Sequence, residues 1–277
     1  VGDNELNFDL KFPQINLSIK NKLLSQSKDK HKLFNTINFF GSEIKSELDI
    51  NKNSLKYKSL KSKIFNTPLN FNGLIEFKPF YLVSNIVLDQ LNLIKVLRNN
   101  DSFFQSFNKK NLVHKNFNSR ISLDIKKFSS DNIFDRGKLN IEIQNGLIKF
   151  DNSKLISDKL GYLKIISSKI YNRNNKIIFD TQILINITNQ KKFYNTFQVP
   201  KKYREDIKTI NLEFETNLTV GETKISNFQI NNIVTKNLTG QINKIIKEND
   251  IDINKNFNNW IVLKRFLNTI ILEINQE

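Results

Sequence analysis

The sequence predicts a mostly β fold, built as an elongated, curved antiparallel sheet with a few short helices. The first observation is alternation: over residues 210–220, mainly apolar residues hold the even positions and polar residues hold the odd ones. Successive side chains of a strand point to opposite faces, so this segment has one apolar and one polar face. The second observation is composition, because the 277-residue chain contains no alanine and is rich in isoleucine and phenylalanine, which suit strands. One-sided strands need a cover for the apolar face, and the nature of that cover is the functional question.

The alternation begins near the N-terminus. Apolar residues occupy even positions over 6–12 and odd positions over 15–19, with Pro13 between the two runs. We predict a bulge or bend at this proline, which would keep the apolar side chains on one face. The spacing of apolar residues over 33–40 fits a short helix, within a segment (21–41) whose structure the pattern leaves ambiguous. Further strands are predicted over 44–50, 69–77 and 81–88.

A helical pattern then interrupts the strands. Leu88, Leu91, Ile94 and Leu97 recur at every third position, and Asp89 can cap a helix that starts there. We therefore predict a helical insert over residues 88–113.

The central block carries the clearest turn signal. Asn145-Gly146 separates two alternating runs, and both residues adopt positive φ readily, as a two-residue hairpin requires. Such a loop would pair Ile143 with Ile148 and Ile141 with Phe150 on one face. Further strands are predicted over 161–171, 176–188, 208–220 and 223–231.

The C-terminal segment has a different period. Trp260, Leu263, Leu267, Ile270 and Ile274 are spaced 3, 4, 3, 4, which predicts an amphipathic helix over residues 256–275. This helix could pack on the end of the sheet or contact a membrane or partner. Without a low-complexity linker, we expect residues 1–277 to form a single elongated β domain of a longer chain.

The formal net charge of +16 is compatible with an anionic partner. The lysines are scattered, however, which favours a solvated surface over a nucleic-acid site. The absence of cysteine excludes disulfides and thiolate metal sites. The two histidines, His31 and His114, lack a second ligand at a metal-site spacing. We therefore expect no enzyme activity, no cofactor, no metal and no nucleic-acid partner.

Several segments resemble the C-terminal region of the AsmA superfamily, which includes TamB and YhdP. The resemblance is carried by Ser119–Phe128 (SRISLDIKKF), Gly137–Phe150 (GKLNIEIQNGLIKF), Leu160–Ile165 (LGYLKI) and the paired strands that follow. An earlier stretch, Asn72–Leu97, is similar to the strand-then-helix passage of that family. The resemblance covers about half of the chain and includes no catalytic signature.

This resemblance implies a periplasmic protein that is anchored in the bacterial inner membrane by a segment outside this chain. Such proteins hold phospholipid acyl chains in a hydrophobic β-groove and are implicated in moving phospholipids to the outer membrane and in envelope homeostasis. The alternation is compatible with such a groove, because burial of each CH₂ group gains about 0.8 kcal/mol without any special side chain.

Ten apolar residues of the central and later strands are the predicted groove lining. They are Ile141, Ile143, Ile148, Phe150, Phe179, Ile183, Ile185, Leu212, Phe214 and Leu218. The alternative is a structural or interaction protein, in which the sheet closes on its own core and the basic surface binds an anionic partner.

Overall fold

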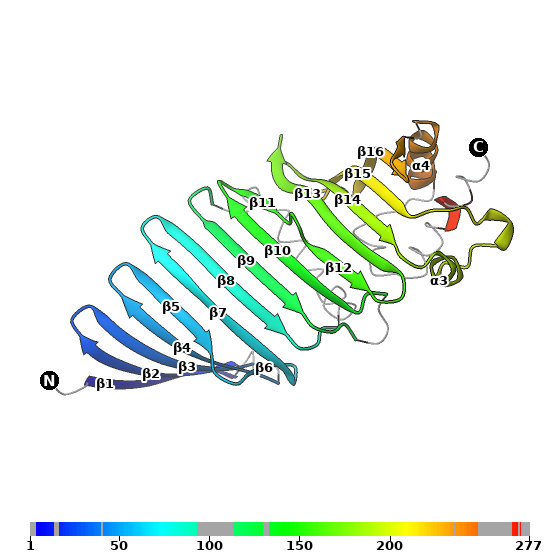
Figure 1. Ribbon diagram of the computed structural model, residues 1–277. Helices are drawn as coiled ribbons and strands as arrows, with labels where there is room; N and C mark the ends of the chain where they lie inside the picture. Colours follow the sequence, from blue (N-terminus) through cyan, green and yellow to red (C-terminus); the bar gives the residue numbers. More distant parts are fainter. Residues whose placement is uncertain are drawn as a thin grey trace. The chain divides into compact units, whose positions relative to one another are not determined.

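The computed structural model describes residues 4–13, 17–39, 41–92, 114–129, 133–234, 236–248, 268–270 and 272. These residues confirm a mostly β fold with few short helices (Figure 1). The chain divides into two compact units, each described by itself below. Unit 1 comprises residues 1–91, 114–129 and 138–146, and unit 2 comprises residues 92–113, 130–137 and 147–277. The prediction of one β domain concerns the organisation of the whole chain and stays a prediction.

Unit 1 is a sheet whose strands follow one another mainly by hairpins (Figure 1). Strands β1 to β5, the short β6, and β7 and β8 pair antiparallel in chain order, with β5 and β6 sharing the position between β4 and β7. Strand β9 then pairs with β8, and β10 pairs with β9. The strands are β1 (Asn4–Phe12), β2 (Leu17–Ser27), β3 (Lys30–Phe39), β4 (Ser42–Asn51), β5 (Ser54–Ser59), β6 (Ser62–Ile64), β7 (Thr67–Phe77), β8 (Phe80–Leu88), β9 (Asn118–Ile125) and β10 (Arg136–Gln144).

Unit 2 combines a second antiparallel run of strands with short helices. Strands β13, β14, β15 and β16 pair in chain order, and β12 and β11 pair with β13. The elements are β11 (Leu147–Lys149), β12 (Lys154–Ser157), β13 (Gly161–Arg173), β14 (Lys176–Ile187), α3 (Gln190–Thr196), the 3-10 helix η2 (Lys201–Tyr203), β15 (Thr209–Asn217), β16 (Glu222–Ile230), β17 (Ile233–Val234) and α4 (Lys236–Glu248).

Several of the predicted strands and turns are confirmed. Asn145 and Gly146 form a turn with φ of 53° and 78°. Strands β13 and β14 meet at Asn174 and Asn175, which also have positive φ, and Gly221 (φ 80°) joins β15 to β16. Side chains with an amide, or no side chain at all, tolerate this left-handed backbone, which is why the sequence marks these turns.

Two sequence-based predictions near the N-terminus are wrong. Residues 33–39 do not form a helix: Leu33 and Ile37 belong to β3, where they alternate with Phe34 and Thr36 across the sheet. The parity change at Pro13 reflects a chain reversal, since β1 ends at Phe12 and pairs antiparallel with β2. In this hairpin Leu10 lies opposite Ile19, so even positions of one strand face odd positions of the next.

The antiparallel prediction also fails at one place. Strand β9 runs parallel to β8, with Leu82 opposite Ser119 and Leu88 opposite Ile125. Parallel neighbours need a long connection, and residues 89–117 supply one. The predicted helix over 88–113 does not begin at Leu88, which is the last residue of β8. Residues 93–113 lie outside the described residues.

The helices of unit 2 were predicted only in part. Helices α3 and α4 had no predicted counterpart. Of the predicted helix over 256–275, residues 268–270 and 272 are described and are helical, and the others lie outside the described residues.

Candidate functional site

The strands of unit 1 present one mainly apolar face, which we call the open face. It consists of the even-numbered residues of β1, β4 and β8 and the odd-numbered residues of β2, β3, β5 and β7, because the strand registers bring these positions to one side. One row, for example, runs from Leu10 through Ile19 and Ile37 to Ile44.

Described parts of the protein leave this face largely uncovered. In β1, Leu6 is 58% exposed, Phe8 41%, Leu10 47% and Phe12 45%. Among the described residues of β1 to β5, no large apolar side chain is fully buried; those of unit 1 that are buried lie in or after β7, such as Leu69 and Ile125. An apolar face of this extent on a water-exposed sheet is a mark of a binding surface.

A row of polar side chains crosses the open face between two apolar rows. Asn21, Asn35, Ser46 and Ser59 lie opposite one another on β2 to β5. Asn35 Nδ2 donates to Asn21 Oδ1 at 2.7 Å, and Asn21 is only 8% exposed. A register slip of two residues would keep the apolar face but would set an asparagine against an aliphatic residue. The amide pair therefore fixes the register of the strands.

The Tyr57 side chain reaches from β5 across β7 to β8. It lies opposite Gly73, and its hydroxyl donates to the Val83 carbonyl oxygen at 3.1 Å. A Cβ on Gly73 would lie 2.1 Å from that oxygen and 2.3 Å from the Tyr57 hydroxyl. Only glycine leaves room for this arrangement, in which an aromatic ring takes the place of the missing side chain.

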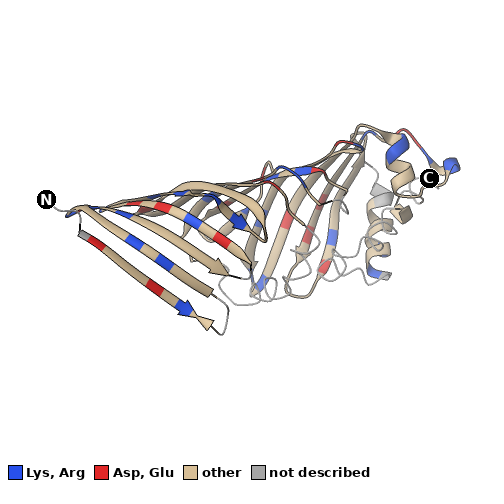
Figure 2. Ribbon diagram, turned by 90° about the horizontal axis from the view of Figure 1, so that it is seen from below, with Lys and Arg blue, Asp and Glu red and all other residues tan. Residues whose placement is uncertain are grey.

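The opposite face of unit 1 is charged and internally paired. Glu47 accepts from Lys32 at 2.8 Å and from Lys58 at 2.9 Å, and Glu5 accepts from Lys22 at 2.9 Å. These ion pairs hold the pKa of Glu47 below its usual value, first through the Lys32 hydrogen bond and then through Lys58. Figure 2 shows lysine and acidic residues interspersed on these strands. The described charges of this face are therefore of mixed sign.

A depression of about 430 Å³ lies at one end of β1 to β4. Leu17 and Phe39, from open-face positions, line it together with Lys11 and Glu43, from positions of the opposite face.

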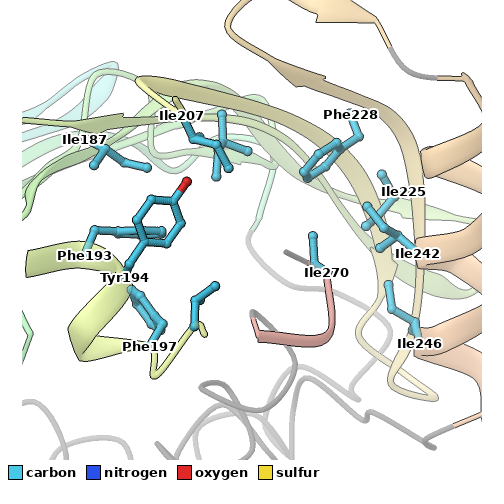
Figure 3. Packing of buried hydrophobic residues seen from close by; sticks show 12 residues of the cluster. Ile187, Phe193, Tyr194, Phe197, Ile207, Ile225, Phe228, Ile242, Ile246 and Ile270 are labelled. Atoms are coloured by element: carbon cyan, nitrogen blue, oxygen red, sulfur yellow. The ribbon is translucent and has the colours of Figure 1, made fainter. Parts of the chain in front are cut away.

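In unit 2 the apolar face of the sheet is filled by the protein itself (Figure 3). Phe193 and Phe197 of the α3 region pack with sheet residues such as Phe228. Ile242 of α4 and Ile270 complete this cluster, and both are almost fully buried. This end of the unit 2 sheet is a closed hydrophobic core.

The ten predicted lining residues do not share one environment. Ile185, Leu212 and Phe214 pack against the core cluster of unit 2. Ile148 is buried, whereas the remaining six are partly exposed. The rings of Phe150, Phe179 and Phe214 form an edge-to-face series, with centroid separations of 6.3 Å and 6.1 Å. Ile141 and Ile143 belong to β10, and the other eight residues belong to unit 2. Within unit 2, Ile183 lies opposite Leu212, so these two occupy neighbouring positions on the same face.

The open face of β1 to β8 was not among the sequence-based candidates, although its alternation was visible in the sequence. The sequence-based candidates lie on the central and later strands, where the hairpin signal is clearest. Alternation shows which side of a strand is apolar but does not show which strands receive helices, so sequence patterns gave no means of ranking the two units.

Comparisons of the chain with protein-family models, with curated proteins and with solved structures gave no match. In the part of the chain that the structure describes, every helix is too short or too polar to cross a bilayer.

Proposed function

We propose that this chain is an AsmA-like lipid-handling protein and that the open face of unit 1 holds phospholipid acyl chains. The observation that carries the proposal is the uncovered apolar face of β1 to β5, which lacks any fully buried large apolar side chain among its described residues. Acyl chains are a suitable cover because they need apolar surface and no fixed polar contacts. Each CH₂ group that leaves water contributes up to about 0.8 kcal/mol.

The arrangement of the open face favours acyl chains as its cover, rather than further side chains of the protein. Two apolar rows run across the strands, one through Ile19 and Ile37 and one through Leu23 and Leu33. By resemblance to the AsmA superfamily, the proposed setting is the periplasm, with an inner-membrane anchor outside this chain and transport toward the outer membrane as the role.

The test is lipid recovery from wild type and from matched variants of β3. Leu33→Asp combined with Ile37→Asp places two charges on the open face, where water can still solvate them in the lipid-free protein. Thr36→Asp is the control, since Thr36 lies on the opposite face between Lys20 and Lys45. We expect mass spectrometry of solvent extracts to find phospholipid in wild type and in the control, and at least tenfold less in the double variant.

Circular dichroism must show that all three proteins keep their β content. The proposal is wrong if wild-type protein carries no phospholipid and takes up no fluorescent phospholipid from phosphatidylglycerol–phosphatidylethanolamine vesicles. It is also wrong if the double variant, while folded, retains as much lipid as wild type.

A further inference from the structure

One hairpin of unit 1 carries a side chain that its backbone does not favour. Phe65 and Asn66 join β6 to β7, with φ of 47° and 65°. A left-handed backbone is rare for a bulky residue, because its Cβ crowds the carbonyl oxygen that follows. Two-residue turns with positive φ at both positions prefer asparagine or glycine for this reason.

Three other described hairpins have the same kind of turn and follow this preference. In each of them two residues with positive φ join the strands, and the first of the two is asparagine. These turns are Asn145-Gly146, Asn174-Asn175 and Asn231-Asn232. Among the four turns, only the one at Phe65 has an aromatic residue in place of that asparagine.

Burial does not explain the phenylalanine. Phe65 is 66% exposed, so contacts with the described residues offset little of the strain in its backbone. The turn is held instead by a polar contact: the Phe65 N–H donates to Ser42 Oγ at 3.1 Å, and Ser42 is only 3% exposed. Asparagine at position 65 would supply the same N–H. A strained and exposed aromatic side chain that the fold does not use indicates contact with another molecule.

The surroundings of Phe65 are basic. Lys61 and Lys63 precede the turn, and both are exposed. Among the described residues neither lysine has an ion-pair partner, since Glu43, which lies opposite Lys63, is bound by Lys45 at 2.9 Å. Residues 61–66, which we call the Phe65 tip, thus combine two positive charges with one exposed aromatic ring.

The open face reaches the same end of the unit 1 strands. Phe12, Leu17, Phe39 and Ser42 form its last row across β1 to β4. Phe12 is 45% exposed, and Ser42 is the residue that holds the Phe65 turn. A surface that receives Phe65 would therefore lie beside the end of the open face.

We propose that the Phe65 tip docks unit 1 on the surface of an anionic lipid bilayer. The aromatic ring enters the boundary between headgroups and acyl chains, and Lys61 and Lys63 are attracted to the lipid phosphates. Asparagine would hold the turn with less strain but would gain nothing from this boundary, which accounts for the phenylalanine. Docking on a bilayer goes beyond the binding of acyl chains by the open face and does not depend on it.

Sedimentation with vesicles tests the docking, and Phe65→Asn is the decisive variant because it gives the turn the residue of the three other hairpins. We expect wild type to bind vesicles of phosphatidylglycerol and phosphatidylcholine more tightly than vesicles of phosphatidylcholine alone. Phe65→Asn should weaken binding to the anionic vesicles roughly tenfold. It should also leave the urea midpoint of unit 1 unchanged or raise it, whereas the loss of a residue needed for folding would lower that midpoint.

The lysines are tested by a pair of variants with the same net charge. Lys61→Asn combined with Lys63→Gln should weaken binding to the anionic vesicles roughly tenfold or more. Lys28→Gln combined with Lys30→Gln is the control, because these exposed lysines lie at the β2–β3 turn, at the other end of the strands. This control should lose much less affinity.

Tryptophan variants locate the contact. After subtraction of the wild-type signal, which comes from Trp260, the emission of Phe65→Trp should shift to shorter wavelength when anionic vesicles are added. Phe77→Trp is the control and should show no such shift, because Phe77 is 39% exposed but lies at the other end of β7.

The proposal is overturned if wild type does not bind anionic vesicles, which is the result expected of a tip that contacts a protein instead. Equal binding by wild type and folded Phe65→Asn overturns it as well, and so do equal losses from the two lysine pairs. Leu33→Asp combined with Ile37→Asp should still bind the vesicles, so a failure of acyl-chain binding can be told apart from a failure of docking.

Discussion

Replacement of glycine by alanine should have opposite effects at Gly73 and Gly240. A Cβ on Gly73 would lie 2.1 Å from the Val83 carbonyl oxygen, whereas a Cβ on Gly240 meets nothing within 4 Å. Because real Cβ contacts are essentially never shorter than 3.0 Å, the Val83 carbonyl must move by about 0.9 Å or more, the difference between these two distances. That carbonyl belongs to the β7–β8 pair, so the strands themselves must separate.

The magnitudes follow from these contacts. Overpacking of this kind costs about 1–3 kcal/mol, and loss of the Tyr57 hydrogen bond adds about 1 kcal/mol. Gly73→Ala should therefore destabilise unit 1 by about 2–4 kcal/mol. Gly240 lies inside α4, where alanine is the better helix former, so Gly240→Ala should stabilise by up to about 1 kcal/mol.

Hydrogen exchange measured by mass spectrometry separates the two effects, because it reports on each unit locally. Peptides that cover β7 and β8 should exchange roughly a hundredfold faster in Gly73→Ala, and peptides that cover α4 should exchange more slowly in Gly240→Ala. Tyr57→Phe is the control for the lost hydroxyl and should account for only the smaller part of the Gly73 effect. Unchanged protection of β8 in Gly73→Ala would refute the clash derived from the backbone distance.

Two further predictions concern α4 and the charged face of unit 1. Asn243→Ala leaves the N–H and C=O of buried Ile225 without their amide partner. The free energy of unfolding should fall by about 2 kcal/mol, and the Ile225 amide should exchange faster. Lys247→Ala is the control and should leave the exchange rate of that amide unchanged. The pKa of Glu47 is lowered in the folded protein, so its contribution to stability is complete above the unfolded value of 4.5 and is lost as the pH falls through the folded value. The stability of unit 1 against urea should therefore fall below about pH 4.5. Glu47→Gln should be less stable than wild type at about pH 7 but should lose less stability on acidification. If both proteins lose the same stability on acidification, this role of Glu47 is contradicted.

The sequence alone determined the β class, most strands and the positions of the turns. Alternation is a local property, and residues such as Asn145-Gly146 and Asn174-Asn175 mark turns because few other side chains tolerate positive φ. The parity change at Pro13 was visible too, but its cause was a hairpin, which only the pairing of Leu10 with Ile19 distinguishes from a bend. Leu33 and Ile37 fit both a helix and a strand, and their neighbours across β2 and β4 decided for the strand.

Only the tertiary structure decided which apolar strands stay uncovered. Leu212 and Leu10 both belong to clear alternations, yet Leu212 packs against the core cluster of unit 2 and Leu10 is 47% exposed on the open face. The difference comes from α3 and α4, which contribute to the core cluster on the unit 2 sheet, and alternation within a strand does not encode where a helix packs. The parallel β8–β9 pair has the same origin, because strand order depends on where a long connection returns.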